Sequence, residues 1–229
     1  MAVYWNGTSL RTKGIVVEKI PNITKAAKRF KTYDISGRDG VLVVDQGTYD
    51  PFALSLECHF NEDNYNINEI KEFLDGYGTL SLDGVKQYNA IIQNNIDFEE
   101  IFRSGFRKFV IQFLVNPIAS DINSTEVTIS SSPTTFSNAS TTKTYPILTI
   151  KGSGDVSITF NNKTFYLYDL DSSKTYTLDC GAKEIYDNNN NNCSNLMKYD
   201  FPYLIKGNNT ISYTGTITQF KIEYKKTYI

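Results

Sequence analysis

The sequence predicts a mainly β protein with two domains, an N-terminal β-sheet domain carrying one short helix and a C-terminal β-sandwich of jelly-roll type. Three observations lead to this prediction. The 229 residues include 16 Tyr and 14 Phe beside many Asn, Ser and Thr, a composition typical of half-buried strands and polar turns. In the first half, apolar residues recur with a period of two, and only one segment has the helical period. The second half contains short strands at about 8–12-residue spacing, which favours a sandwich.

The first half is expected to be mostly strands. Alternate residues from Phe52 to Phe60 are apolar, and Ser55 and Glu57 lie among the residues between them. A strand with this pattern turns its apolar set toward a core. Shorter runs predict further strands at residues 14–19, 41–44, 78–82, 88–92 and 109–115.

One segment, residues 66–76, has the helical period instead. Its four large apolar residues fall on one helical face: Ile67, Ile70, Phe73 and Leu74. Asn66 can cap the first turn, Glu69 follows three residues later, and Gly76 can end the helix. The pattern predicts a short amphipathic helix packed on the sheet.

The composition changes after Pro117, and we place the two domains at residues 1–120 and 121–229. Residues 120–144 are rich in Ser, Thr and Asn, which favours an inter-domain region with one edge strand at 126–129. Strands are expected at residues 147–151, 156–160, 163–170, 175–178, 183–186, 209–213 and 216–224. Turns at 152–154, 161–162 and 207–209 separate some of them, and 152–154 is interpreted as a hairpin turn.

Charge and targeting signals exclude some classes of protein. The formal net charge is −2, with 23 basic and 25 acidic residues, whereas a nucleic-acid binder needs a clear excess of Lys and Arg. The N-terminus lacks the basic and apolar segments of a secretory signal, and no run of apolar residues is long enough to span a membrane. We expect a protein made in the cytoplasm, with no membrane contact.

The reactive residue types do not form a recognisable catalytic or metal site. Cys58, Cys180 and Cys193 lack the paired spacing of zinc ligands. Cys180 and Cys193 could bridge an Asn-rich loop, although free thiols are favoured. The single His, His59, lies next to Cys58 in a predicted strand, where neighbouring side chains point to opposite faces. A structural role is therefore the favoured interpretation of His59.

Two acidic pairs were considered as the carboxylates of a glycan hydrolase, Glu99 with Glu100 and Asp169 with Asp171. Neither has support beyond its presence, and solvated turn acids are the commoner explanation. The sequence thus predicts no catalytic residue, no cofactor and no metal, and we expect a protein that is not an enzyme.

One local charge excess stands out, formed by Lys25, Lys28, Arg29 and Lys31 with Phe30 among them. Such a cluster fits an exposed loop or hairpin, and it could also contact an acidic partner surface or nucleic acid.

Short motifs occur along almost the whole chain in a familiar order. They lie at residues 4–7 (YWNG), 37–42 (GRDGVL), 47–50 (GTYD), 53–60, 73–80, 109–117, 145–148 (YPIL), 150–154 (IKGSG), 161–162, 179–180, 185–186, 201–204 (FPYL) and 207–211 (GNNTI). In this arrangement the sequence resembles the distal tail protein (Dit) family of long-tailed phages and related prophage tail components.

The resemblance implies a virion protein of the tail tip or baseplate. It implies a homo-hexameric ring of N-terminal domains, with galectin-like C-terminal sandwiches projecting outward. The ring would join the tail tube protein and the tape measure protein to the receptor-binding parts, and DNA would pass through its channel without specific binding. Within this hypothesis Lys25, Lys28, Arg29 and Lys31 are candidates for the ring interface. The alternative function is a carbohydrate-binding module or adhesin.

Overall fold

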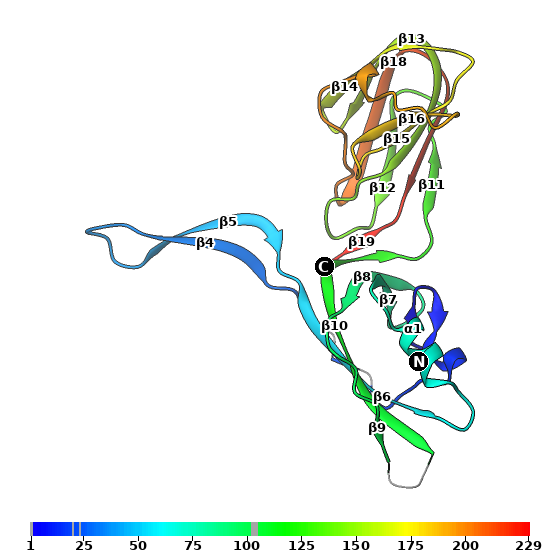
Figure 1. Ribbon diagram of the computed structural model, residues 1–229. Coiled ribbons are helices and arrows are strands. Elements are labelled where there is room, and N and C mark those ends of the chain that lie inside the picture. The colour runs from blue at the N-terminus through cyan, green and yellow to red at the C-terminus, as the bar shows by residue number, and fades with distance from the viewer. Residues whose placement is uncertain (1, 20, 23, 102–104) are drawn as a thin grey trace. The chain divides into compact units, whose positions relative to one another are not determined.

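The computed structural model describes residues 2–19, 21–22, 24–101 and 105–229, most of which lie in strands (Figure 1). The expected mainly β class is confirmed. The chain divides into two compact units, Met1–Ile122 with Ile229, and Asn123–Tyr228. Each unit has its own cluster of buried apolar residues. The two units are described separately below.

The N-terminal unit is an antiparallel sheet with one helix. Its elements are β1 (Tyr4–Trp5), β2 (Thr8–Ser9), a 3-10 turn η1 (Leu10–Lys13), β3 (Val16–Val17), β4 (Lys28–Asp34), β5 (Val41–Tyr49), β6 (Phe52–Asn61), α1 (Ile67–Phe73), β7 (Tyr77–Ser81), β8 (Lys86–Ile92), β9 (Glu99–Glu100) and β10 (Phe106–Asp121). The strands are ordered β2-β1-β7-β8-β10-β6-β3, β9 pairs with β10, and β4 and β5 form a separate two-stranded sheet.

The main sheet of this unit curls around its core. Trp5 on β1 contacts Phe113 on β10 with ring centroids 5.3 Å apart, although β7 and β8 lie between these strands in the sheet. Ile70 and Leu74, at and just after α1, are buried in the same cluster. The alternation predicted for residues 52–60 is confirmed, because Leu54, Leu56, Cys58 and Phe60 are buried and the residues between them are not.

The predicted helix is confirmed, and it ends earlier than expected. The Asn66 side chain caps it by accepting a hydrogen bond of 2.8 Å from the backbone N–H of Asn68. The helix stops at Phe73, because Leu74 leaves helical geometry (φ −93°, ψ 36°) while its N–H still bonds to Ile70. Gly76, expected to end the helix, lies beyond it with φ +73°. The packing of Leu74 into the core therefore decides where the helix ends.

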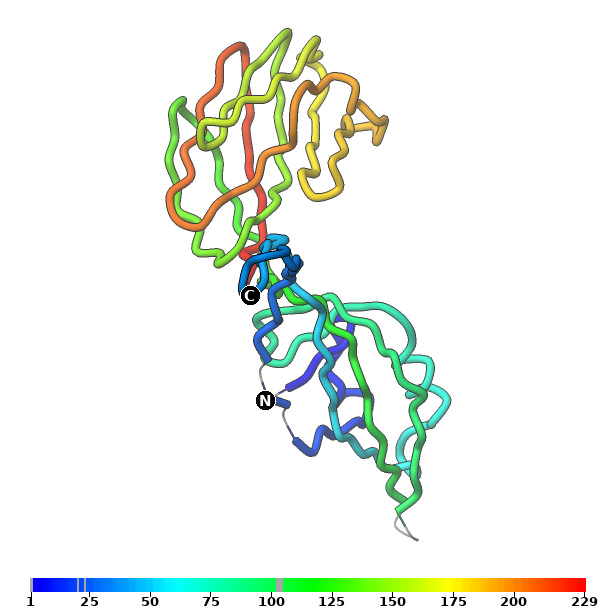
Figure 2. Tube along the Cα trace, turned by 90° about the vertical axis from the view of Figure 1, so that its left-hand side faces the viewer, coloured from blue at the N-terminus to red at the C-terminus, as the bar shows by residue number. Residues whose placement is uncertain are grey.

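The C-terminal unit consists of strands and one 3-10 turn. Its elements are β11 (Thr125–Thr128), β12 (Thr134–Asn138), β13 (Ile147–Phe160), β14 (Lys163–Leu170), β15 (Tyr176–Asp179), β16 (Glu184–Asp187), η2 (Ser194–Leu196), β17 (Met197–Lys198), β18 (Gly207–Tyr224) and β19 (Thr227–Tyr228). The central order is β11-β18-β13-β14-β17, with β12 on β18 and with β15 on β13 and β16. Figure 2 follows the same chain from the side.

Two long strands, β13 and β18, run through both layers of this unit. The first part of β13 pairs with β15 and with the end of β18, and its last part pairs with β14 and the beginning of β18. The register shifts between these parts, near Gly152 and Ser153. The predicted hairpin turn at 152–154 is therefore wrong. The segment bends one strand, and Gly154 has a positive φ of +68°, which serves a bulge as well as a tight turn.

The predicted inter-domain stretch, residues 120–144, is also structured. It holds β11 and β12, which pair with opposite ends of β18. Both are outer strands with alternate exposed residues, so they need few large apolar side chains. The strands expected at 209–213 and 216–224 are one strand, β18, and the turn expected at 207–209 is its beginning, with Asn209 buried.

Candidate assembly interface

The hairpin of β4 and β5, residues 28–49, is called the arm below. Its strands pair only with each other among the described strands (Figure 1). Every residue of β4 is exposed, as is every residue of β5 except the half-buried Tyr49. A lone two-stranded hairpin is at best marginally stable in water, and its two open edges can pair with other chains. The arm therefore has the features of a segment that is completed by a partner.

The arm is apolar on both faces. In its register Tyr33 lies opposite Leu42, and Thr32 lies opposite Val43. Because directly opposed residues share a face and neighbours alternate, Tyr33 and Leu42 occupy one face and Val43 the other. The exposed apolar residues of the arm and its turn are Phe30, Tyr33, Ile35, Val41, Leu42, Val43 and Val44, each 41–53% exposed. If a partner covered only one face of the arm, the apolar residues on the other face would remain in water.

Two ion pairs lie at the base of the arm. Lys28 pairs with Asp45 across the strands, and Arg29 Nε donates to Asp50 Oδ1 at 2.5 Å. The hydrogen bond to Asp45 raises the pKa of Lys28, and the same contact lowers the pKa of Asp45. Both pairs are exposed, so their contribution to stability is small, but they fix the direction in which the arm leaves β6.

The four predicted interface residues all lie on or just before β4. Lys28 and Arg29 are neutralised within the chain, whereas the exposed side chains of Lys25 and Lys31 make no ion pair with any described residue. Residues 25–50 hold five basic and four acidic side chains. The arm is thus nearly neutral as a whole, and its main surface feature is apolar.

A second apolar surface, called the sheet face below, lies on the main sheet of the same unit. Leu114 of β10 is opposite Ile91 of β8 and Ala53 of β6. Val110, four residues before Leu114, lies on the same side. Ile91, Val110 and Leu114 are 41%, 39% and 37% exposed. The solvent side of an antiparallel sheet is usually polar, so the sheet face is a second candidate contact surface.

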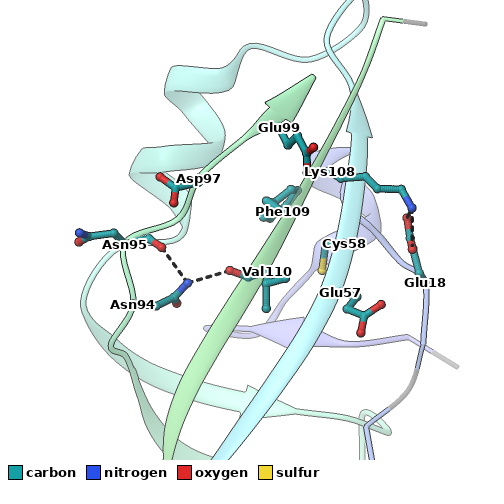
Figure 3. A pocket seen from close by; sticks show the side chains of 10 residues that line it. All are labelled: Glu18, Glu57, Cys58, Asn94, Asn95, Asp97, Glu99, Lys108, Phe109 and Val110. Carbon is teal, nitrogen blue, oxygen red and sulfur yellow. Dashed lines mark hydrogen bonds and ion pairs between the residues drawn. The ribbon is translucent and has the colours of Figure 1, made fainter. Parts of the chain in front are cut away.

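An acidic hollow of about 390 Å³ adjoins the sheet face at Val110 (Figure 3). Four carboxylates line it: Glu18, Glu57, Asp97 and Glu99. Glu18 is neutralised, since its Oε1 lies 3.1 Å from both Lys108 Nζ and His59 Nδ1, and the hydrogen bond from Lys108 lowers the pKa of Glu18. Glu57, Asp97 and Glu99 make no ion pair with any residue that the structure describes. The hollow therefore carries a negative charge without an internal counter-charge.

The wall of the hollow is held in place by Asn94 (Figure 3). Its Nδ2 donates to the carbonyls of Asn95 and Val110 at 2.9 Å, and its Oδ1 accepts from the N–H of Gln112 at 2.8 Å. The Asn94 side chain thus links the segment that follows β8 to backbone C=O and N–H groups of β10. The hollow is consequently a fixed feature of the sheet.

The residues weighed for catalysis are separated or already bonded. Cys58 is buried, and burial raises the pKa of its thiol to about 12, whereas His59 points to the other face and contacts Glu18. All three cysteines are free thiols. Arg107 binds Glu100 at 3.5 Å, and adjacent Glu99 and Glu100 alternate across β9.

The second acidic pair supports turns. Asp171 accepts hydrogen bonds from the N–H and hydroxyl of Ser173 at 2.9 and 2.8 Å, and these bonds lower the pKa of Asp171. Asp171 therefore holds the turn that follows β14. Among the described residues there is no cluster of metal-ligating side chains, and no described helix is long and apolar enough to cross a membrane.

The sequence located the basic cluster but missed both apolar surfaces. For the arm, the sequence signal is the run at residues 41–44 (VLVV), in which apolar residues do not alternate with polar ones. Such a run predicts a strand covered on both sides, yet the chain itself covers neither side. The sheet face gave a weaker signal, since Val110 and Leu114 occupy the positions where polar residues were expected.

Comparison with known proteins finds a family match for the C-terminal unit and a shared fold for the whole chain. The family described as "Siphovirus-type tail component, C-terminal domain" matches residues 139–228. The crystal structure of the Dit protein of phage SPP1 superimposes with a TM-score of 0.80, covering 100% of this chain and 99% of that chain at 13% identity. Residues 139–228 thus match the siphovirus-type tail component family, and the whole chain shares its fold with the Dit protein of phage SPP1. A chain in the baseplate structure of phage P2 is more distantly similar, with a TM-score of 0.50 and 8% identity over 95% of this chain and 92% of that chain. No curated protein sequence matches.

Contiguous apolar surfaces that stay exposed commonly mark sites of contact with another molecule. The described SPP1 protein is presented as a paradigm of the hub adsorption apparatus in phages that infect Gram-positive bacteria.

Proposed function

We propose that this protein is a member of the Dit family and a non-enzymatic structural hub of the phage tail tip, which assembles into a closed hexameric ring. The ring joins the tail tube and tape measure proteins to the receptor-binding apparatus, and DNA passes through its channel. Support for the hub role comes from the family and from the fold shared with the SPP1 protein. Support for the ring comes from the arm.

The observation that carries the ring is an arm that is apolar on both faces and unpartnered within its own chain. The occupant is a second copy, because the same unit carries the sheet face, which is also apolar and uncovered. An arm and a sheet face are two different patches, so the contact is heterologous, and such contacts generate rings when the rotation closes.

Complementary charges select the alignment in which the two copies meet. The uncompensated side chains of Lys25 and Lys31 on one copy match the uncompensated carboxylates of the acidic hollow on the next. The hollow adjoins the sheet face at Val110, so one neighbour engages both. Complementary charges of this kind steer association and exclude wrong registers more than they add affinity.

Two variants with one defective patch each test the heterologous contact. Leu42→Thr with Val43→Thr removes apolar area from both arm faces, and Val110→Thr with Leu114→Thr does so on the sheet face. Threonine keeps strand propensity, so both variants should fold. Each alone is expected to be monomeric by light scattering, and their mixture should form a one-to-one pair through the single intact patch of each.

The wild type, measured in parallel, should have six times the monomer mass and a central channel in electron micrographs. Ile205→Thr, which removes an exposed apolar residue of the C-terminal unit, serves as the control and should keep the ring. Rings from either double variant, or two variants that stay monomeric when mixed, would contradict the arm-to-face contact.

A second candidate function, saccharide binding, is favoured by an exposed aromatic surface on the C-terminal unit. Tyr166 and Tyr168 stack at 6.1 Å with ring planes 8° apart, and Tyr199 packs against Tyr166 at 5.8 Å. Tyr199 is 64% exposed and has φ +77°, a backbone conformation that is a genuine outlier for a bulky residue. Flat exposed tyrosines can pack against the apolar face of a sugar ring while their hydroxyls hydrogen-bond.

A glycan array and cell-wall pull-down with the full chain separate the two functions. Binding that is lost on Tyr199→Ser would favour the adhesin. Absence of binding by a protein that still forms rings would favour the hub alone.

A further inference from the structure

A patch of two lysines and two tyrosines lies on the C-terminal unit, and it shares no residue with the aromatic surface of Tyr166, Tyr168 and Tyr199. The Nζ of Lys143 is 4.6 Å and the Nζ of Lys163 is 5.1 Å from the centroid of the Tyr203 ring. Lys163 Nζ also lies 3.4 Å from the Tyr203 hydroxyl. The 52%-exposed ring of Tyr145 is a neighbour at 6.1 Å. Two ammonium groups therefore share one phenol ring at the surface.

No carboxylate neutralises this pair of charges. Lys174 and Lys221 of the same unit pair with Asp187 and Glu126, whereas Lys143 and Lys163 make no ion pair with any residue in the described part of the chain. The hydrogen bond from Lys163 and the nearby charge of Lys143 lower the pKa of Tyr203. An uncompensated positive field over a hydroxyl donor is a suitable environment for an anion.

The backbone under the patch is fixed by buried polar side chains. Thr144, between Lys143 and Tyr145, pairs with Leu204, next to Tyr203, through two backbone hydrogen bonds of 3.0 and 2.8 Å. The Thr144 hydroxyl bonds to the hydroxyls of Ser140 and Thr227 at 2.8 and 2.7 Å. Ser140 and Thr144 are at most 1% exposed. The segments that carry Lys143 and Tyr203 are thus joined by a satisfied network, which rigidifies a site.

The segment before Lys163 is tied to the same base. Asn209, fully buried, donates to the carbonyls of Ile205 and Gly207 and accepts from the Ile205 N–H. Its Oδ1 also accepts from Asn161 Nδ2 at 2.8 Å. Three segments distant in sequence are in this way held in one arrangement below the lysines.

We propose that Lys143, Lys163 and the hydroxyl of Tyr203 form a binding site for a phosphate ester, with the exposed ring of Tyr145 packing against the polyol or sugar that carries the phosphate. Phosphate fits better than a carboxylate, because its tetrahedral oxygens can accept from three donors that are not confined to one plane. Lysine is a common phosphate ligand that acts as a point charge. The site is distinct from the arm and the sheet face, and it does not depend on ring formation.

The test measures binding of three probes to the full chain by calorimetry: inorganic phosphate, glycerol phosphate and a phosphodiester-linked glycerol oligomer. Because each variant removes one charged hydrogen bond to the phosphate, Lys143→Gln or Lys163→Gln should each weaken binding of the oligomer by about tenfold or more. The double variant should abolish binding. Lys198→Gln is the matched control, since Lys198 lies 5.5 Å from the ring of Tyr199 alone and should keep wild-type affinity.

The remaining outcomes are also decisive. Tighter binding of the oligomer than of inorganic phosphate supports a phosphate carried on a chain, and equal affinities would overturn that part and leave free phosphate as the ligand. A poly-glutamate peptide that binds as tightly as the oligomer would overturn the preference for phosphate. So would unchanged affinity in a folded Lys143→Gln/Lys163→Gln variant, or no saturable binding at millimolar oligomer.

Discussion

Asp187 shows how a single buried carboxylate organises a loop. Its side chain is fully buried, and it accepts hydrogen bonds from the N–H groups of Asn189 and Asn191 and the amide of Asn191. Lys174 completes the set at 3.0 Å. The bonds from Asn191 contribute most to holding the pKa of Asp187 far below its usual range. The exposed asparagine-rich run at residues 188–192 is wrapped around this acid.

Asp187→Asn should lower the unfolding temperature at pH 7 by several degrees, because it removes the charge that these donors surround. The folded-state pKa is depressed, so the stabilisation is complete above the ordinary aspartate pKa of about 3.9 and is lost as the pH falls through and below it. The gap between wild type and variant should shrink below about pH 4. Thermal melts from pH 7 to pH 3 measure this. A gap that stays constant over the whole range would refute the assignment, and the exposed Asp169→Asn is the control.

At the scale of elements, the bend in the C-terminal unit depends on glycines that approach backbone. Gly215 has φ +94°, and a Cβ there would lie 2.5 Å from the carbonyl oxygen of Asp155. Gly154 also has a positive φ, +68°, but nothing lies within 4 Å of its Cβ position. A side chain at Gly154 would therefore meet only the conformational strain of a positive φ, whereas one at Gly215 would meet both this strain and a steric overlap.

Gly154→Ala is expected to cost about 1–2 kcal/mol, the penalty for a side chain in the left-handed region. Gly215→Ala adds an overlap with the backbone carbonyl of Asp155, at the irregular stretch where β13 and β18 shift register, so its cost should exceed that of Gly154→Ala by about 1 kcal/mol or more. Urea unfolding of both variants gives the comparison. Equal costs would show that the bend can shift to accommodate a methyl group.

The elements also show what the sequence can and cannot predict. The strand at residues 52–60 and the cap at Asn66 were predictable, since period and capping are local signals. The bends of β13 and β18 were not, because glycines with positive φ serve both a turn and a bulge. Residues 41–44 were predicted as a strand, but a local run of apolar residues does not show that the rest of the chain leaves both sides of that strand uncovered.

For the whole molecule, the proposed contact between copies predicts a charge-swap rescue. Lys25→Glu with Lys31→Glu should raise the monomer fraction, and so should Glu57→Lys with Glu99→Lys. Combining all four changes in one chain should restore the ring, because each interface again joins opposite charges. Mass photometry at low salt measures the monomer fraction of each of the three variants. The differences in monomer fraction between the variants should narrow in high salt, because salt screens the charges.

Lys28 and Arg29 provide the contrast. Reversing their charges should also favour the monomer, by disturbing the pairs with Asp45 and Asp50 at the base of the arm, but the Glu57 and Glu99 changes should not rescue it. Rescue of this variant, or failure to rescue the Lys25 and Lys31 variant, would place the basic contact elsewhere.

The two bent strands of the C-terminal unit have a consequence for how it comes apart. Because β13 and β18 each belong to both layers, neither layer can open without pulling on residues that are hydrogen-bonded in the other. Regions that share strands in this way tend to exchange their amide hydrogens as one cooperative unit. The sandwich should therefore lack a half-open state, and a mechanical load applied to one layer would be carried by the whole domain.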